Sequence, residues 1–438
     1  MRSALDKEIL RLAVPSILAN ISVPLVSLVD TAVAGHLTGA GSPAAYLGAI
    51  SVGGMLFNLL YWNFGFLRTG TGGLTAQAFG RASVRGDASM HECGRILVHS
   101  LCLALLFAAA VLLLQWPFAK VGLLLVSSSP EVVSLARQYF FIRIWAAPAT
   151  LCLMAFRGWF IGMQDSRSSM WTDLIVNGVN IAASILLSFG AGKWQGLGFP
   201  GIAWGTVIAQ YAGLLVAFSL LWHYYKRLFV RKSPRRSAAM AKDLLPFFRV
   251  NRDIFLRTLF LVAVNLYFTA AGARQGATIL AVNTLLMQLY LLFSYVMDGF
   301  AYAGEALGGR FWGAGNMAAF HEVVRRLFGW GALMTVLFTL VYVVGGIPFL
   351  RLLTDEPLVV EASRDYVWWA YLIPVAGVAA FVWDGIFIGI THTRGMLVSS
   401  LVAAVVFFIA VTLLMPLMGN HGLWLSMLLY LLMRGVVQ

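Results

Sequence analysis

Apolar stretches of 18 or more residues recur from one end of the sequence to the other. Each is long enough to cross a hydrocarbon core of about 30 Å as a helix. Only 11% of the residues are charged and 60% are hydrophobic, whereas soluble domains carry about 25% charged residues. The sequence therefore predicts an all-α polytopic membrane protein.

Hydropathy and turn residues together predict twelve membrane-spanning helices. The first apolar stretch is too long for a cleaved signal peptide and is interrupted by Pro15 and Pro24, so it is interpreted as the first span. The predicted spans are 9–36, 45–79, 94–118, 136–163, 168–191, 199–225, 252–273, 278–309, 322–350, 362–391, 395–418 and 421–438.

The basic residues cluster in alternate loops and account for the formal charge of +13. Lys and Arg in short loops orient membrane spans toward the cytoplasm. We therefore expect an inner-membrane protein with both termini cytoplasmic, and the charge gives no reason to expect a nucleic-acid partner. Ten basic residues lie between Lys226 and Arg257. This polybasic stretch is interpreted as a cytoplasmic surface segment; a lipid-sensing role is the alternative.

Two halves of the sequence repeat the same pattern. YFFIRIWAAP at 139–148 precedes GWFIG at 158–162, and YVWWAYLIP at 366–374 precedes GIFIG at 385–389. In both halves 19 residues separate the first Tyr from the first Gly. The paired glycines of each GxxxG are predicted to let helices pack closely.

A weaker repeat relates residues 47–80 to residues 280–313. We therefore predict two pseudo-symmetric lobes of six helices, with an N-terminal lobe at 1–225, a basic linker at 226–251 and a C-terminal lobe at 252–438. Parallel repeats place a substrate pathway between the halves and give alternating access by rocking.

Ionisable residues within spans are the strongest candidates for function, because a charge at a helix centre costs about 2.5 to 3.5 kcal/mol on insertion. Static ion pairs between helices are the competing interpretation. The candidates are Asp30, Arg68, Arg143, Arg157, Asp298, Glu305 and Asp384.

Asp30 lies in SLVDTAVAGH, with no basic residue within a helical turn on either side. A buried acid without a counter-ion favours its neutral form, and an exchangeable proton site needs an acid that can become neutral. Asp30 is therefore the predicted proton or cation site.

Four other charged positions leave alternatives open. Arg68 and Asp298 lie at similar levels of their spans, so a link from Arg68 to Asp298 or Glu305 is expected to be either a gate or a permanent strut. Arg157 aligns with Asp384 in the repeat. The two could pair with each other, or serve separately as a cation site and a strut.

Asn177 and Asn180 lie three residues apart on one helical face and can hydrogen-bond a partner in a dry interior. An enzyme is not expected. HEVVR at 321–325 begins like a zinc-protease motif, but Arg325 stands where the second His is required. We predict no metal site and no cofactor, only a coupling ion.

Four segments resemble the multidrug and toxic compound extrusion (MATE) family, most closely its DinF branch. They are AVPSILANISVPLVSLVDTAVAGHL at 13–37, GLTAQAFGR at 73–81, DGFAYAGEA at 298–306 and DGIFIG at 384–389. The resemblance implies a V-shaped pair of six-helix lobes. It also implies export of organic cations or other amphipathic compounds in exchange for protons or sodium.

The resemblance further implies roles for single residues. Asp30 matches the first-helix acid of the family, Pro15 its helix bend, Asn180 a polar position of the fifth helix and Asp384 an acid of the C-terminal lobe. Ser184 stands where many relatives have a second acid. This departure favours a proton over sodium, with Asp30 acting alone beside Asn180.

Coupling is expected at Asp30, with Asp298, Glu305 and Asp384 as second candidates. The expected partners are small organic substrates and membrane lipids, and the chain is expected to be a monomer. Two alternatives remain: a lipid or oligosaccharide flippase of the same superfamily, and a channel-like protein that does not pump.

Overall fold

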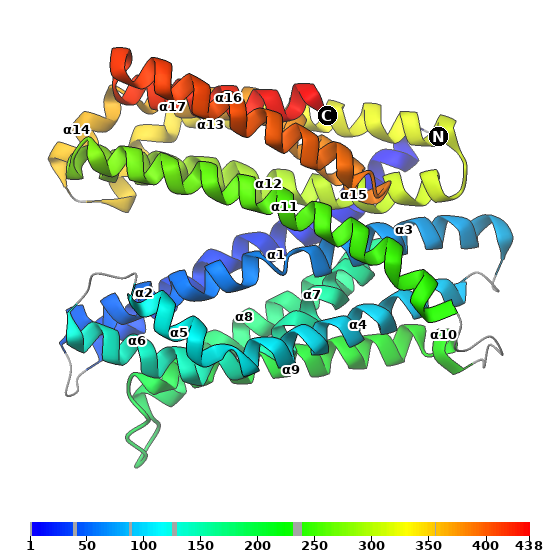
Figure 1. Ribbon diagram of the computed structural model, residues 1–438, viewed down its shortest axis with the longest axis horizontal. Helices are drawn as coiled ribbons and strands as arrows, with labels where there is room; N and C mark the ends of the chain where they lie inside the picture. Colours follow the sequence, from blue (N-terminus) through cyan, green and yellow to red (C-terminus); the bar gives the residue numbers. More distant parts are fainter. Residues whose placement is uncertain (1, 38–41, 87–89, 125–128, 231–238, 355) are drawn as a thin grey trace. The chain divides into compact units, whose positions relative to one another are not determined.

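The structure, a computed structural model, describes residues 2–37, 42–86, 90–124, 129–230, 239–354 and 356–438. In these ranges the chain is almost entirely helical (Figure 1). Residues 231–238 of the predicted basic linker lie outside the described residues, as do the side chains of 239–249. The lipid-sensing alternative for the linker therefore stays a prediction.

The chain divides into two compact units. We call residues 18–244 the N-terminal lobe, and residues 1–17 together with 245–438 the C-terminal lobe. The start of the chain thus belongs with the second half, whereas the sequence predicted that it belongs with the first.

Ion pairs join the first 17 residues to the second half. Asp6 accepts hydrogen bonds from Arg326 at 3.1 Å and from the indole N–H of Trp330 at 3.2 Å. Glu8 lies 3.5 Å from Arg310. The first helix, α1 (Arg2–His36), passes into the N-terminal lobe between Ile17 and Leu18, two residues after Pro15.

The remaining helices of the N-terminal lobe follow in chain order. They are α2 (Pro43–Trp62), α3 (Phe66–Arg85), α4 (Met90–Leu113), α5 (Gln115–Leu124), α6 (Pro130–Arg143), the short η2 (Ile144–Ala146), α7 (Ala147–Gly162), α8 (Ser166–Phe189), α9 (Pro200–Tyr225) and α10 (Arg227–Val230). Those of the C-terminal lobe are α11 (Ala239–Arg274), α12 (Ala277–Gly313), α13 (Met317–Leu353), α14 (Pro357–Arg364), α15 (Val367–Gly389), α16 (Thr393–Met418) and α17 (Asn420–Val437).

Eleven helical stretches in the described part of the chain are long and apolar enough to cross a membrane. They correspond to the first eleven predicted spans, and α2 and α3 together form one of them. The twelfth predicted span is α17, which has 18 residues. It is not among the eleven because Asn420, His421 and Arg434 lower its mean hydropathy.

The internal repeat is confirmed by two identical turns. Gln164 follows α7 with φ 64°, and Thr391, 227 residues later (391 − 164), follows α15 with φ 54°. These are the two non-glycine residues with positive φ in the described part of the chain. In both turns the next residue's N–H bonds to a carbonyl five positions earlier at 2.9 Å, Phe160 in one and Phe387 in the other.

The GxxxG pairs pack as predicted, and at matching positions in both lobes. A Cβ added to Gly158 would lie 2.0 Å from the Arg68 carbonyl oxygen on α3, and one added to Gly385 would lie 2.0 Å from that of Ala301 on α12. Arg68 and Ala301 are also equivalent in the weaker repeat of the sequence. The close approach of α7 to α3 therefore recurs between α15 and α12.

Candidate functional site

Asp30 lies on α1 inside the N-terminal lobe, with 8% of its surface exposed. The Ser184 hydroxyl group on α8 is hydrogen-bonded to its carboxyl group. The other carboxyl oxygen, Oδ1, is buried and has no hydrogen-bond partner. A buried polar atom without a partner is unfavourable, so this oxygen is well suited to bind a proton or a ligand group.

Ser184 belongs to a chain of hydrogen bonds between α8 and α9. Its hydroxyl also lies 3.4 Å from Asn180 Oδ1, and the Asn180 amide donates to Thr206 Oγ1 at 3.1 Å. Thr206 in turn donates to the Ile202 carbonyl oxygen at 3.3 Å. The structure thus brings together Asp30, Asn180 and Ser184, which the sequence analysis had selected.

Small residues on α9 make this arrangement possible. A Cβ on Gly205 would lie 2.6 Å from Ser184 Oγ and 2.7 Å from its backbone nitrogen. One on Gly201, a turn earlier, would lie 2.5 Å from the Leu187 carbonyl carbon. The helices α8 and α9 therefore pack backbone to backbone beside Ser184, which brings Thr206 within reach of Asn180.

Arg143, at the end of α6, is the positively charged neighbour of Asp30. Its guanidinium group donates to the Tyr139 hydroxyl oxygen at 2.7 Å and lies 4.6 Å from the centroid of the Phe57 ring. Aromatic rings thus hold this cation, and it interacts with Asp30 electrostatically rather than through a direct ion pair. The sequence identified Arg143 as an intramembrane charge without assigning it a role.

Asn177 lies nearly one turn before Asn180 and contacts α1 directly. Its amide donates to the Ser22 hydroxyl oxygen at 2.6 Å. Ser22 donates to the Ala19 carbonyl oxygen at 2.6 Å. The two asparagines therefore connect α8 to α1 on one side and to α9 on the other.

Asp384 in the C-terminal lobe has a different environment, because two arginines surround it. It pairs with Arg257 on α11, and its Oδ2 also accepts from Arg434 on α17 at 2.5 Å. Its Oδ1 accepts from the Gln438 amide at 2.8 Å. Both arginine side chains are largely buried, so the carboxylate joins three helices of the lobe through ion pairs.

The other predicted charges are also located. Arg157 on α7 pairs with Asp173 on α8. Arg68 lies on α3 of the N-terminal lobe, whereas Asp298 and Glu305 lie on α12 of the C-terminal lobe, and Glu305 is fully buried. The gate or strut expected between Arg68 and these acids stays a prediction.

Three partners in these ion pairs were missed by the sequence analysis: Asp173, Arg257 and Arg434. Arg257 and Arg434 had been assigned to the cytoplasmic ends of their spans. Asp173 lies within the predicted span 168–191, sixteen residues after Arg157. Its position inside an apolar span was a signal that could have revealed it.

Comparison with known proteins gives one consistent result. The sequence pattern of the family described as MatE matches residues 15–186 and 254–414. The chain is 37% identical to the DNA damage-inducible protein F of Escherichia coli over 98% of this chain and 90% of that protein. It is 28% identical to the probable multidrug resistance protein NorM of Pseudomonas putida, over 77% of this chain and 70% of NorM.

Solved structures show the same fold. A MOP superfamily transporter from Pyrococcus furiosus superposes with a TM-score of 0.82 at 18% identity, covering 99% of this chain and 94% of that one. An outward-facing multidrug resistance MATE family transporter gives a TM-score of 0.83 at 19% identity, with the same coverage of both chains.

Proposed function

Because the chain belongs to the MatE family, we propose that it is a secondary active exporter that exchanges cationic or amphipathic organic compounds for protons. The observation that carries the proposal is the buried Asp30 carboxyl group, with one oxygen unpartnered and Arg143 beside it. Alternating access of the two lobes would expose this site to each side of the membrane in turn.

The charges at the site give a physical reason for exchange. While Asp30 is ionised, its charge offsets that of Arg143, and a cationic guest meets no net repulsion. Once Asp30 binds a proton, the charge of Arg143 is no longer offset and opposes a cation in the same cavity. Proton and substrate thus lower each other's affinity, which is the linkage that antiport requires.

A proton is favoured over sodium by the same residues. Hard cations need several oxygen ligands, and the polar groups at Asp30 are one hydroxyl group and, one residue further, one amide oxygen. Arg143 would also repel a bound metal cation. Asp298, Glu305 and Asp384 remain second candidates for coupling, and Pro15 is proposed to bend α1 near its passage between the lobes.

We also propose the inner membrane as the location, with both termini cytoplasmic, and a monomeric transporter. The distribution of basic residues in alternate loops supports this orientation. Labelling of single cysteines introduced beside Arg81 and beside Lys193 with an impermeant thiol reagent tests it. We expect only the site beside Lys193 to be labelled from outside, and the reverse pattern would overturn the orientation.

The function is tested with purified protein in liposomes under an imposed pH or sodium gradient. We expect efflux of an organic cation to follow the pH gradient and to be lost in Asp30→Asn. Glu361→Gln removes an exposed carboxylate of the C-terminal lobe and serves as the control. Gradient-driven efflux that persists in Asp30→Asn would refute the role of Asp30, and movement without any gradient coupling would indicate a channel.

A further inference from the structure

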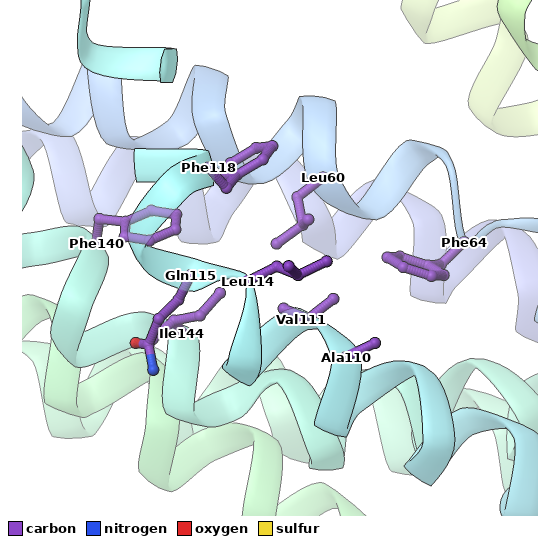
Figure 2. A pocket seen from close by; sticks show the side chains of 9 residues that line it. All are labelled: Leu60, Phe64, Ala110, Val111, Leu114, Gln115, Phe118, Phe140 and Ile144. Carbon is purple, nitrogen blue, oxygen red and sulfur yellow. The ribbon is translucent and has the colours of Figure 1, made fainter. Parts of the chain in front are cut away.

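The N-terminal lobe contains an apolar cavity away from Asp30. It has a volume of about 190 Å³ and lies among α2, α4, α5 and α6. Figure 2 shows its lining, which includes Phe64, Val111, Phe118 and Phe140. One lining residue is polar, Gln115, and its amide donates to the Leu112 carbonyl oxygen at 2.8 Å. The cavity therefore presents no unmet hydrogen bond.

The size of the cavity suits a hydrocarbon group. An apolar cavity of about 150 Å³ in a protein core stays dry and binds benzene. A cavity of about 190 Å³ therefore accepts a stretch of an acyl chain of comparable bulk. Apolar walls without polar partners exclude water as the preferred occupant.

The cavity adjoins a surface that faces lipid. Leu114, which lines it, is 60% exposed, and its neighbours Leu113 and Trp116 are 80% and 60% exposed. In a membrane protein such side chains meet the acyl chains of the bilayer. A lipid chain could therefore enter sideways, from hydrocarbon to hydrocarbon, without crossing a polar layer.

A cation lies beside the cavity. The Arg137 guanidinium carbon lies 5.6 Å from the centroid of the Trp116 ring and 5.9 Å from that of Phe141. Arg137 is exposed and precedes the lining residue Phe140 by one helical turn, and the exposed Lys120 follows Trp116 by one turn on α5. Arginine on an aromatic surface is well suited to bind a phosphate group.

From this arrangement we propose that the N-terminal lobe binds an anionic phospholipid, with an acyl chain in the cavity and the phosphate group at Arg137 and Lys120. The two parts of the site match the two parts of one molecule. A free phosphate ion would use only the cations, and an uncharged hydrocarbon only the cavity. The proposal does not depend on the coupling chemistry at Asp30.

Native mass spectrometry of the purified chain, titrated with phosphatidylglycerol and separately with phosphatidylcholine, tests the proposal. Ala110→Phe fills the cavity, and Leu106→Phe adds the same ring to a 63% exposed position one turn earlier on α4. We expect Ala110→Phe to weaken phosphatidylglycerol binding at least tenfold and Leu106→Phe to leave it unchanged. Arg137→Gln should reduce the preference for phosphatidylglycerol over phosphatidylcholine, and Arg137→Lys should retain it.

Three results would overturn the proposal. The first is undiminished phosphatidylglycerol binding in Ala110→Phe, and the second is equal binding of both lipids by the native chain. The third is full displacement of the lipid by millimolar inorganic phosphate, which would indicate a site for the headgroup alone. Melting temperatures identify a variant that fails to fold, in which case Leu60→Trp replaces Ala110→Phe as the filled cavity.

Discussion

The Ser184 hydroxyl group is hydrogen-bonded to the Asp30 carboxyl group and also lies 3.4 Å from Asn180 Oδ1. A hydroxyl group has one proton to donate. It can donate to an ionised Asp30, or it can accept a proton from a neutral Asp30 and turn its own toward Asn180. The serine thus offers a partner to both charge states of the acid, which a second carboxylate in its place would not do without a proton of its own.

Replacement of this serine tests the arrangement. In Ser184→Ala the ionised Asp30 loses a donor, and a hydrogen bond to a charged group contributes about 1.5 to 3 kcal/mol. The proton is then retained at higher pH, so the midpoint of the pH profile of transport should rise by about one unit or more. Liposome efflux measured across a pH series checks this shift.

The control for that experiment lies on the same helix. Ser188 is also buried, four residues after Ser184, and its hydroxyl oxygen has no hydrogen-bond partner. Ser188→Ala should leave the midpoint where it is. Equal profiles for the native chain and Ser184→Ala would show that Asp30 does not depend on the hydroxyl group.

Arg143 makes a second, separable contribution to the pH profile. In Arg143→Gln the ionised Asp30 loses a favourable charge, so the acid keeps its proton to higher pH and the midpoint should again rise. Release of a cationic substrate by protons should also become weaker, because no positive charge then remains at the site. Substrate binding measured at pH 5 and pH 8 should therefore differ less than in the native chain.

The exposed Arg274 at the end of α11 supplies the control, as Arg274→Gln removes one cation far along the chain from the site. It should leave the binding ratio unchanged. A native ratio in Arg143→Gln would argue that aromatic packing, and not the charge, is the function of this residue.

The fold could be predicted from the sequence because its signals lie within single segments. Membrane spans depend on local hydropathy, and the repeat on spacings such as that from Tyr139 to Gly158. Which half the first helix joins could not be predicted in this way. That outcome depends on ion pairs of Asp6 and Glu8 with residues more than 300 positions away.

The equivalence of the two lobes gives a prediction of stability. Gly158→Ala and Gly385→Ala each place a methyl group 2.0 Å from a backbone carbonyl oxygen of the neighbouring helix. Overpacking of this kind typically costs about 1 to 3 kcal/mol. Both variants should lower the melting temperature in detergent, and by similar amounts.

Gly178→Ala is the matched control, because no atom lies within 4 Å of the added methyl group. Alanine also has a higher helix propensity than glycine, so this variant should be as stable as the native chain or slightly more stable. A normal melting temperature for Gly158→Ala together with a low one for Gly385→Ala would contradict the structural equivalence of the two contacts.

The site was only partly predictable for a related reason. Asp30, Asn180 and Ser184 were identified because each stands out within its own span. The partners of Asp384 were missed, since Arg257 and Arg434 lie at the ends of helices where a basic residue is ordinarily an orientation signal. Only the three-dimensional packing of α11, α15 and α17 shows that both arginines are turned toward one carboxylate.

Asp384 therefore offers a direct choice between a structural and a coupling role. Asp384→Asn leaves Arg257 and Arg434 buried without their anion, and the loss of one partner of a buried pair costs about 3 to 5 kcal/mol. We expect a large fall in melting temperature, partly reversed when Arg257→Gln removes one of the two cations. A variant that keeps its native melting temperature but loses proton-driven efflux would instead identify Asp384 as a coupling acid, because a purely structural ion pair cannot be lost without a loss of stability.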